Sequence, residues 1–244
     1  MIKNLKSSKM EKMLVDSDQS VIPKGVILPE SQSRQLWEAY ALVEIIIYTI
    51  TIPYQISFSG NGISYVQFSF DLWLDCFFLL DVYARLQRFA IMREGFLISN
   101  PKEFRSIYLR SDLRLDLVSV LPVSTIGYLC NIRDGQYGLL RLFQLTRIRH
   151  FGTYLDNFVE AFNSRMNFSI STAIMRILEI FLIVVFLCHW FACMFHLLGS
   201  KKTEETWLVA DDSANEPASI RYLRSFYWAL YTGEISFQRM KAIN

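Results

Sequence analysis

The sequence predicts an all-α membrane protein with five membrane-crossing helices. The 244-residue chain is 52% hydrophobic and 15% aromatic, which is more apolar than is usual for a soluble domain of this length. Its charged residues make up 20% of the chain and cluster between long apolar stretches. Because a helix needs about 20 apolar residues to cross the hydrocarbon core of a bilayer, these stretches carry the prediction.

The apolar stretches differ in how well they meet that requirement. They cover residues 36–58, 65–84, 113–129, a fourth segment that begins at about Gly138, and 177–199. The fifth is sufficient alone, whereas the second, third and fourth contain acids or arginines. A charged side chain at the bilayer centre costs at least ~2.5 kcal/mol, so we expect these charges to pair inside a bundle rather than face lipid.

The embedded charges have opposite signs on different stretches. The acids lie on the second and third stretches and the arginines on the fourth, namely Asp71, Asp75, Asp81, Asp112, Asp116, Arg141 and Arg147. This distribution favours ion pairs between helices that face a crevice. An ionisable residue inside the membrane marks a candidate functional site.

The fourth stretch carries a polar residue at every third position of "RLFQLTRIRH", at Arg141, Gln144, Arg147 and His150. On an α-helix, three steps turn the chain by about 300°, so these side chains would form a slowly winding stripe. Arginine remains charged when desolvated, which suits a side chain that responds to the membrane field. Two interpretations remain open at this point: a voltage sensor and a static ion-pair network.

Loop charges predict the topology. Basic residues dominate the N-terminal segment and the connection 85–114, whereas the loop 59–64 is uncharged and residues 201–216 are acidic on balance. The positive-inside rule therefore places the N-terminus in the cytoplasm and predicts a multi-pass protein, with the plasma membrane as its location. Gly60-Asn61-Gly62 is typical of a short external turn.

Other classes of site are disfavoured. The chain has no basic run that would suggest a nucleic-acid partner, no enzyme-like catalytic constellation and no cofactor motif. Its four cysteines indicate reduced thiols in or near apolar stretches. His189, Cys193 and His196 share a face of the fifth stretch, but three ligands on one helix rarely complete a tetrahedral metal site, so packing is the better interpretation.

Several segments together resemble one family. "FFLLDVYARLQRFAIMREGFLISNPKEFRSIYLRSDLRLDLVSVLPVS" is similar to the second-to-third segment region of the cyclic-nucleotide-gated and hyperpolarisation-activated cation channel superfamily. "LPESQSRQLWEAYALVEIIIYTITIPYQISF" resembles the first segment of that family, "LCHWFACMFHLLG" the fifth, and "YLRSFYWALYT" the pore helix. The similarity covers roughly residues 26–232.

The resemblance assigns roles to individual residues. It implies that Phe78 and Asp81 form a charge-transfer site, which Asp116 completes, and that Asp75 is an outer counter-charge. The same comparison implies voltage-sensing roles for Arg141, Arg147 and Arg149. Gln144 stands where this family usually carries a charge, so the resemblance implies a dilute sensor.

The resemblance also implies a domain order. Residues 1–35 would be a cytoplasmic segment, 36–152 a four-helix voltage-sensor-like bundle, and 153–199 a linker with one pore-domain helix. Residues 200–232 would form an extracellular turret and a re-entrant pore helix that contains Tyr227 and Trp228 and ends at Gly233. Residues 233–244 would be a divergent tail.

The family pattern continues after the pore helix into a glycine-rich filter, which this sequence lacks. We therefore expect a chain truncated before the filter, either as an incomplete gene product or as a genuine short subunit. The first functional hypothesis is the bilayer-embedded part of a potassium or mixed monovalent cation channel subunit, active in a homo- or hetero-tetramer. The alternatives are a non-conducting regulatory or dominant-negative membrane subunit and a proton-permeable sensor.

Overall fold

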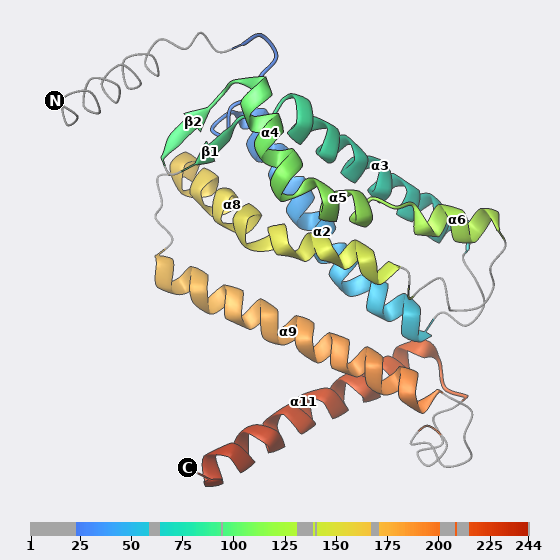
Figure 1. Cartoon of the computed structure of the whole chain (residues 1–244). Helices are drawn as coiled ribbons and strands as arrows, with labels where there is room; N and C mark the ends of the chain where they lie inside the picture. Colours follow the sequence, from blue (N-terminus) through green and yellow to red (C-terminus); the bar gives the residue numbers. More distant parts are fainter. Residues whose placement is uncertain are drawn as a thin grey trace.

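The computed structural model describes residues 23–58, 64–93, 95–130, 139, 141–166, 171–200, 208 and 215–243, with α-helix as the main element (Figure 1). The helices, in chain order, are α2 (Gln32–Phe58), α3 (Tyr65–Gln87), α4 (Pro101–Ser111), α5 (Leu113–Ser119), α6 (Val123–Leu129), the 3₁₀-helix η1 (Arg141–His150), α8 (Phe151–Met166), α9 (Thr172–Gly199) and α11 (Ala218–Ile243). Three expectations concern residues that lie outside the described part: residues 1–22, the turn at 60–62, and most of 201–216.

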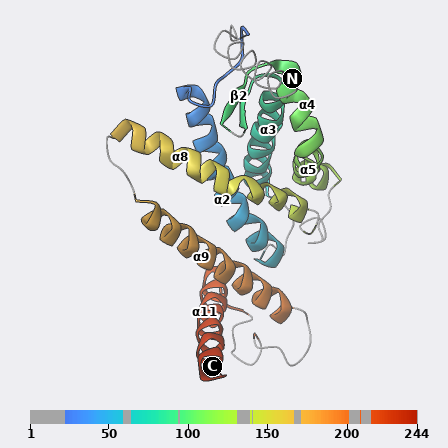
Figure 2. The same ribbon diagram turned by 60° about the vertical axis from the view of Figure 1, so that its left-hand side comes forward.

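Helix α2 is the centre of the molecule, because it packs against η1, α8 and α9. Figures 1 and 2 show it running behind the η1–α8 rod, with α9 on its other side. The hydrophobic core joins side chains of α2, α3 and α8, namely Ala41, Leu42, Ile45, Tyr48, Ile52, Leu74, Phe78, Tyr154 and Leu155. The functional side chains described below surround this core.

Helix α3 buries all of its aspartates, together with some apolar side chains, and exposes mainly apolar side chains. It begins at a Ser64 cap, whose hydroxyl accepts a hydrogen bond from the Gln67 amide. Three of its aspartates are buried, whereas its exposed positions include Val66 and Trp73. This reversal of the soluble pattern is what a helix in a lipid-embedded bundle shows, since its charges must face protein partners.

The connection after α3 contains a small antiparallel hairpin that the all-α prediction did not include. Strands β1 (Ile91–Arg93) and β2 (Phe96–Ile98) pair around Gly95, which adopts the left-handed φ of 82°. Asn100 then caps α4 through its side chain, and Pro101 occupies the first turn of the helix. The Asn100-Pro101 pair therefore marks a helix start.

The third stretch is not one continuous helix, so the expectation of a single span over 113–129 is wrong. It divides into α5 and α6, and residues 120–122 between them are not helical. Pro122 has no amide hydrogen and adopts a ψ of 66°, which interrupts the helical hydrogen bonds. The interruption leaves the Leu121 carbonyl free to accept a hydrogen bond from Gln144.

The fourth stretch is a 3₁₀-helix from Arg141 to His150 and becomes an α-helix at Phe151. The predicted winding α-helical stripe is therefore wrong in its geometry. A 3₁₀-helix has three residues per turn, so residues three apart lie directly above one another. The polar stripe is straight, and one side of the rod presents all of it to the bundle.

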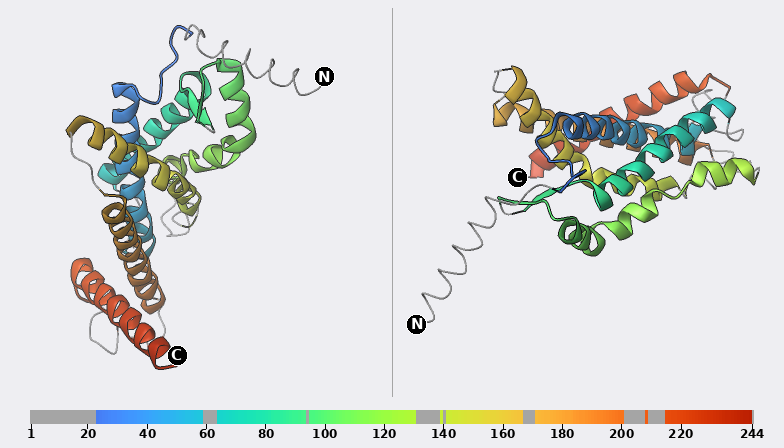
Figure 3. Two further views of the ribbon diagram at one scale, coloured as in Figure 1. Left: turned by 90° about the vertical axis from the view of Figure 1, so that its left-hand side faces the viewer. Right: turned by 90° about the horizontal axis from the view of Figure 1, so that it is seen from above.

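Helices α9 and α11 form a V below the bundle, whose open side faces left in Figure 1 (Figures 1 and 3). Helix α9 begins five residues before the expected start at residue 177, and α11 continues through Gly233, so the expected helix end at that glycine is wrong. Much of the described surface of α9 is apolar and exposed, including Ile177, Phe181 and Leu198.

Two helices of the described part are long and apolar enough to cross a membrane. They are α2 and the segment Ala173–Gly199 of α9. Helix α3 is also long enough, but its three aspartates exceed the charge that such a span tolerates alone. The charges of α3 and η1 therefore need partners inside the bundle.

Candidate functional site

The polar stripe of η1 enters the bundle as a straight column. Arg141 and Gln144 are completely buried, and Arg147 is 4% exposed. Helix η1 packs against α2 on one side and α5 on the other, while the aspartates of α3 face it. Each residue of the column has different partner side chains, and these partners together with the column make up the candidate site.

Arg141, at the first level of the column, forms a buried ion pair with Asp71. Its Nη1 atom lies 2.9 Å from Oδ2 of Asp71, and its Nη2 atom donates to Oδ1 at 3.0 Å. The guanidinium also donates to the side chains of Gln55 and Gln144. A two-point pair of this kind is geometrically specific, and it offsets part of the cost of burying both charges.

Gln144 occupies the next level and meets Asp75. Its Nε2 atom donates to Oδ1 of Asp75 at 3.0 Å, and the Tyr48 hydroxyl donates to the same oxygen at 2.7 Å. Asp75 was predicted as an outer counter-charge, but at this level its partners are a neutral amide and a phenol.

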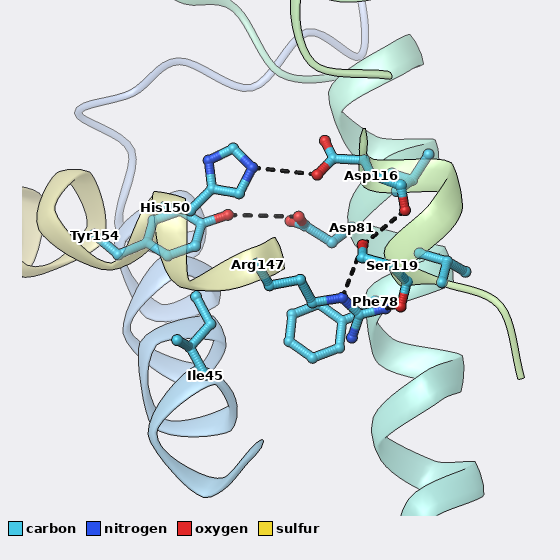
Figure 4. A pocket seen from close by; sticks show the side chains of 10 residues that line it. Ile45, Phe78, Asp81, Asp116, Ser119, Arg147, His150 and Tyr154 are labelled. Atoms are coloured by element: carbon cyan, nitrogen blue, oxygen red, sulfur yellow. Dashed lines mark hydrogen bonds and ion pairs between the residues drawn. The ribbon is translucent and has the colours of Figure 1, made fainter. Parts of the chain in front are cut away.

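Arg147 lies on the Phe78 ring (Figure 4). Its guanidinium carbon is 3.4 Å from the ring centre. The Nε and Nη2 atoms donate to the hydroxyl and the carbonyl of Ser119 at 3.1 and 2.6 Å. The ring and Ser119 thus replace water around a desolvated cation without supplying a full negative charge.

Asp116 lies at the end of the column formed by Arg149 and His150. It accepts hydrogen bonds from Arg149 at 2.6 Å and from the Tyr108 hydroxyl at 2.6 Å, and His150 Nε2 lies 3.2 Å from it. Tyr108 is on α4, in the connection between the second and third stretches. Burial, followed by the bond to the Asp116 carboxylate, raises the pKa of Tyr108 well above its ordinary value.

Asp81 lies beside this cluster but does not contact an arginine of η1. It accepts hydrogen bonds from Trp37 Nε1 at 2.7 Å, Arg85 Nε at 2.8 Å and the Tyr154 hydroxyl at 3.4 Å. A cavity of about 10 Å³ is lined by Asp81 and Asp116 together with Arg147 and Phe78. That volume is about the minimum for one water molecule. Figure 4 shows the side chains that line this cavity.

The structure brings together some of the predicted residues and separates others. Arg147 meets Phe78, and Arg149 meets Asp116. The partner of Arg141 is Asp71, which the sequence marked as an embedded acid but not as a counter-charge. The signal for Asp71 was its spacing, one turn before Asp75 on the same face of α3.

Ser119 and Tyr108 were not predicted. Their hydroxyls contact the site only because the chain breaks between α5 and α6 and because α4 folds against α5. No local pattern distinguishes such hydroxyls from other polar residues in a loop or at a helix end.

The predicted pore-helix residues lie on α11, away from the column. Trp228 stacks on Phe195 of α9 with ring centres 3.7 Å apart, and the exposed ring of Tyr227 lies near Tyr231. His189 and His196, which were weighed as metal ligands, contact carbonyl oxygens of α2 at Ile50 and Ser57.

Comparison with known proteins finds ion channels as relatives of this chain. The chain is 25% identical over 217 residues to potassium channel AKT2/3 of Arabidopsis thaliana, covering 85% of this chain and 26% of the relative. It is 25% identical over 198 residues to voltage-gated delayed rectifier potassium channel KCNH1 of Rattus norvegicus, covering 78% and 19%. It is 24% identical over 224 residues to potassium/sodium hyperpolarization-activated cyclic nucleotide-gated channel 3 of Homo sapiens, covering 84% and 29%.

These relatives are ion channels and not enzymes, and they confirm the resemblance to voltage-gated-like cation channels. The chain spans less than a third of the length of each of the three. The profile of the family described as "Ion transport protein" matches residues 34–238. Because that match covers more than half of the chain, this membrane protein belongs to the ion transport protein family.

Proposed function

We propose that residues 36–152 are a voltage sensor and that the chain is the transmembrane part of a potassium or mixed monovalent cation channel subunit. The observation that carries the proposal is the position of Arg147. Its guanidinium is buried on the Phe78 ring, with the Arg141–Asp71 pair on one side and the Arg149–Asp116 pair on the other. A cation held mainly by a ring and Ser119 has a weaker electrostatic anchor than one held by a carboxylate.

The proposed orientation follows from loop charge. With the N-terminus in the cytoplasm, Arg141 lies toward the outside and His150 toward the inside. The column then lies along the membrane field. A voltage change that moved η1 inward would carry Arg147 past Phe78 toward the cavity lined by Asp81 and Asp116.

The expected voltage sensitivity is modest. Each elementary charge that crosses the whole field contributes ~2.3 kcal/mol per 100 mV. Gln144 contributes no charge, so the buried part of the column carries only Arg141 and Arg147. A step that moves one of them through part of the field would move less charge than it would in a column with arginine at all three levels.

Assembly would use α9 and α11. The exposed apolar side chains of α9 suit either lipid or a neighbouring subunit, and the Phe195–Trp228 stack fixes α11 against it. The relatives are named as potassium and potassium/sodium channels, which motivates the proposed ions. A tetramer is the proposed assembly.

Fluorescence recorded under voltage clamp tests the sensor proposal without requiring a current. The full chain carries a dye at Leu139→Cys, beside the outer end of η1, after replacement of the exposed Cys76 and Cys130 by serine. We expect a fluorescence change that saturates with voltage. The same dye on Lys102→Cys, at the start of α4, provides a control with no expected change. A flat response at Leu139→Cys over the accessible voltages would contradict the proposal.

A further inference from the structure

Glu44 on α2 is the most isolated charged group of the bundle. Its side chain is completely buried, and neither carboxyl oxygen has a hydrogen-bond donor. A buried carboxylate without donors or a paired cation is costly enough that such groups usually become neutral. The proposed voltage sensor assigns no role to this residue.

The surroundings of Glu44 are charged on two sides. Arg147 of η1 attracts the carboxylate, whereas Asp81 and Asp75 of α3 repel it. On its own helix, Tyr40 interacts with the carboxyl one turn away. The Tyr40 hydroxyl accepts a hydrogen bond from Trp73 Nε1 at 2.7 Å and retains a lone pair for a second donor.

A balance of buried charges shows why Glu44 is unpaired. Six carboxylates are buried among the described residues: Glu38, Glu44, Asp71, Asp75, Asp81 and Asp116. Four of them form ion pairs, with Arg34, Arg141, Arg85 and Arg149. Asp75 and Glu44 remain, and Arg147 is the one buried arginine of the described part that has no carboxylate within ion-pair distance. Two carboxylates therefore share one positive charge.

The hydrogen bonds distinguish the two carboxylates. Asp75 accepts bonds from Tyr48 and Gln144, which favour its ionised form. Among the described residues, Glu44 has no donor in hydrogen-bond geometry, and the neighbouring Tyr40 hydroxyl is the one hydroxyl group that acts on it, so its negative charge is stabilised less than that of Asp75. The surplus negative charge is therefore removed at the lowest cost by protonation of Glu44.

We infer that Glu44 is a proton-binding site of the bundle and that its proton replaces the positive charge missing at Gln144. The proton comes from water as the bundle forms, and it converts one carboxylate into a neutral carboxyl. The Tyr40 hydroxyl then serves as its acceptor. An arginine at position 144 would lie against Asp75 and would leave Arg147 to neutralise an ionised Glu44.

Infrared spectroscopy of the purified full chain in lipid nanodiscs at neutral pH tests this inference directly. A protonated carboxyl has a carbonyl stretch separate from that of a carboxylate, and the stretch shifts in heavy water. We expect this band in the natural chain and its loss in Glu44→Gln. Gln144→Arg and Asp75→Asn should also remove it, because each restores the balance of charge. Glu103→Gln, at an exposed carboxylate of α4, is the matched control and should leave the band unchanged.

Thermal unfolding gives a second measurement on the same samples. Replacing a neutral carboxyl by an amide of the same shape should leave the unfolding midpoint of Glu44→Gln equal to or above that of the natural chain. A clear fall in that midpoint would mean that Glu44 is an ionised partner of Arg147 and would overturn the inference. Absence of the band in the natural chain, or its persistence in Glu44→Gln, would do the same.

Persistence of the band in both Gln144→Arg and Asp75→Asn would overturn the link to the missing charge. None of these measurements depends on voltage. Their failure is therefore distinct from failure of the proposed sensor function.

Discussion

The guanidinium of Arg147 lies 3.4 Å from the centre of the Phe78 ring, with both side chains buried between α2, α3 and α5. The contact divides the polar column into one part where Arg141 meets Asp71 and a second part around Asp116. An aromatic ring at this position excludes water and still attracts a cation. The proposed charge transfer depends on that combination.

Replacing Phe78 by leucine should destabilise the present position of η1. Leucine fills most of the same space but has no ring face, so the attraction to Arg147 is lost, worth about 2 kcal/mol for a desolvated pair. Phe78→Trp keeps a ring face and should retain or strengthen it. The midpoint of the fluorescence–voltage curve measures the difference. Equal midpoints for the two variants would show that the ring face contributes nothing.

Separating Arg141 from Asp71 should be costly, and removing both charges should cost less than the sum of the two changes. Arg141→Gln alone leaves the Asp71 carboxylate buried without its cation. Asp71→Asn alone leaves the Arg141 guanidinium buried without its anion. Loss of one partner of a buried pair typically costs about 3–5 kcal/mol. Chemical denaturation of the purified chain, applied to both single variants and the double variant, measures the coupling. Arg165→Gln on the exposed part of α8 is the control, with an expected change below about 0.5 kcal/mol. Additive effects would contradict the pairing.

Tyr108→Phe should weaken the inner cluster and change its response to alkali. The variant removes one donor from the buried Asp116, with an expected cost of about 1–3 kcal/mol. The pKa of Tyr108 is raised in the folded chain, so the folded state holds the phenol proton more tightly than the unfolded state. The Tyr108 phenol therefore stabilises the folded state below a pH of about 10, the ordinary tyrosine pKa. This stabilisation falls as the pH rises above that value.

The measurement for Tyr108 is the free energy of unfolding as a function of pH. The natural chain should lose stability more steeply than Tyr108→Phe above that pH. Parallel curves for the two proteins would mean that the phenol is not held by Asp116.

The junction of α2, α9 and α11 should depend on the Tyr222 hydroxyl. His189 Nδ1 lies 2.8 Å from that hydroxyl, and His189 Nε2 lies 2.9 Å from the carbonyl oxygen of Ile50. One ring nitrogen can donate and the other accept, so the imidazole joins three helices. Tyr222→Phe removes one of these bonds and should increase hydrogen exchange in α11. Unchanged exchange would show that α11 is held by the Phe195–Trp228 stack instead.

The sequence predicted the class and most helices because composition and loop charge are local properties. The five apolar stretches correspond to α2, α3, the pair α5 and α6, η1 and α9. It did not predict the 3₁₀ form of η1, because polar residues at every third position fit either helix type. The choice depends on several buried side chains that must meet partners on α2, α3 and α5 at once.

Some of the predicted residues lie together because of their positions along one helix, whereas other contacts of the column depend on the break in another helix. Phe78 and Arg147, to which the family resemblance assigned separate roles, are in contact. Ser119 supplies the remaining contacts of Arg147 because α5 ends there, before Pro122. Asp71 was recognisable as a buried acid, but its pairing with Arg141 depends on the depth of η1 in the bundle, which no local pattern specifies.

The proposal that η1 carries charge through the membrane field is tested most directly by measuring how much charge η1 moves. The measurement compares the steepness of the fluorescence–voltage curve for the natural chain, Arg147→Gln and the surface control Arg110→Gln, each with the dye at Leu139→Cys. We expect a shallower curve for Arg147→Gln alone, because the charge lost is the one proposed to pass Phe78. Equal steepness in all three proteins would contradict it.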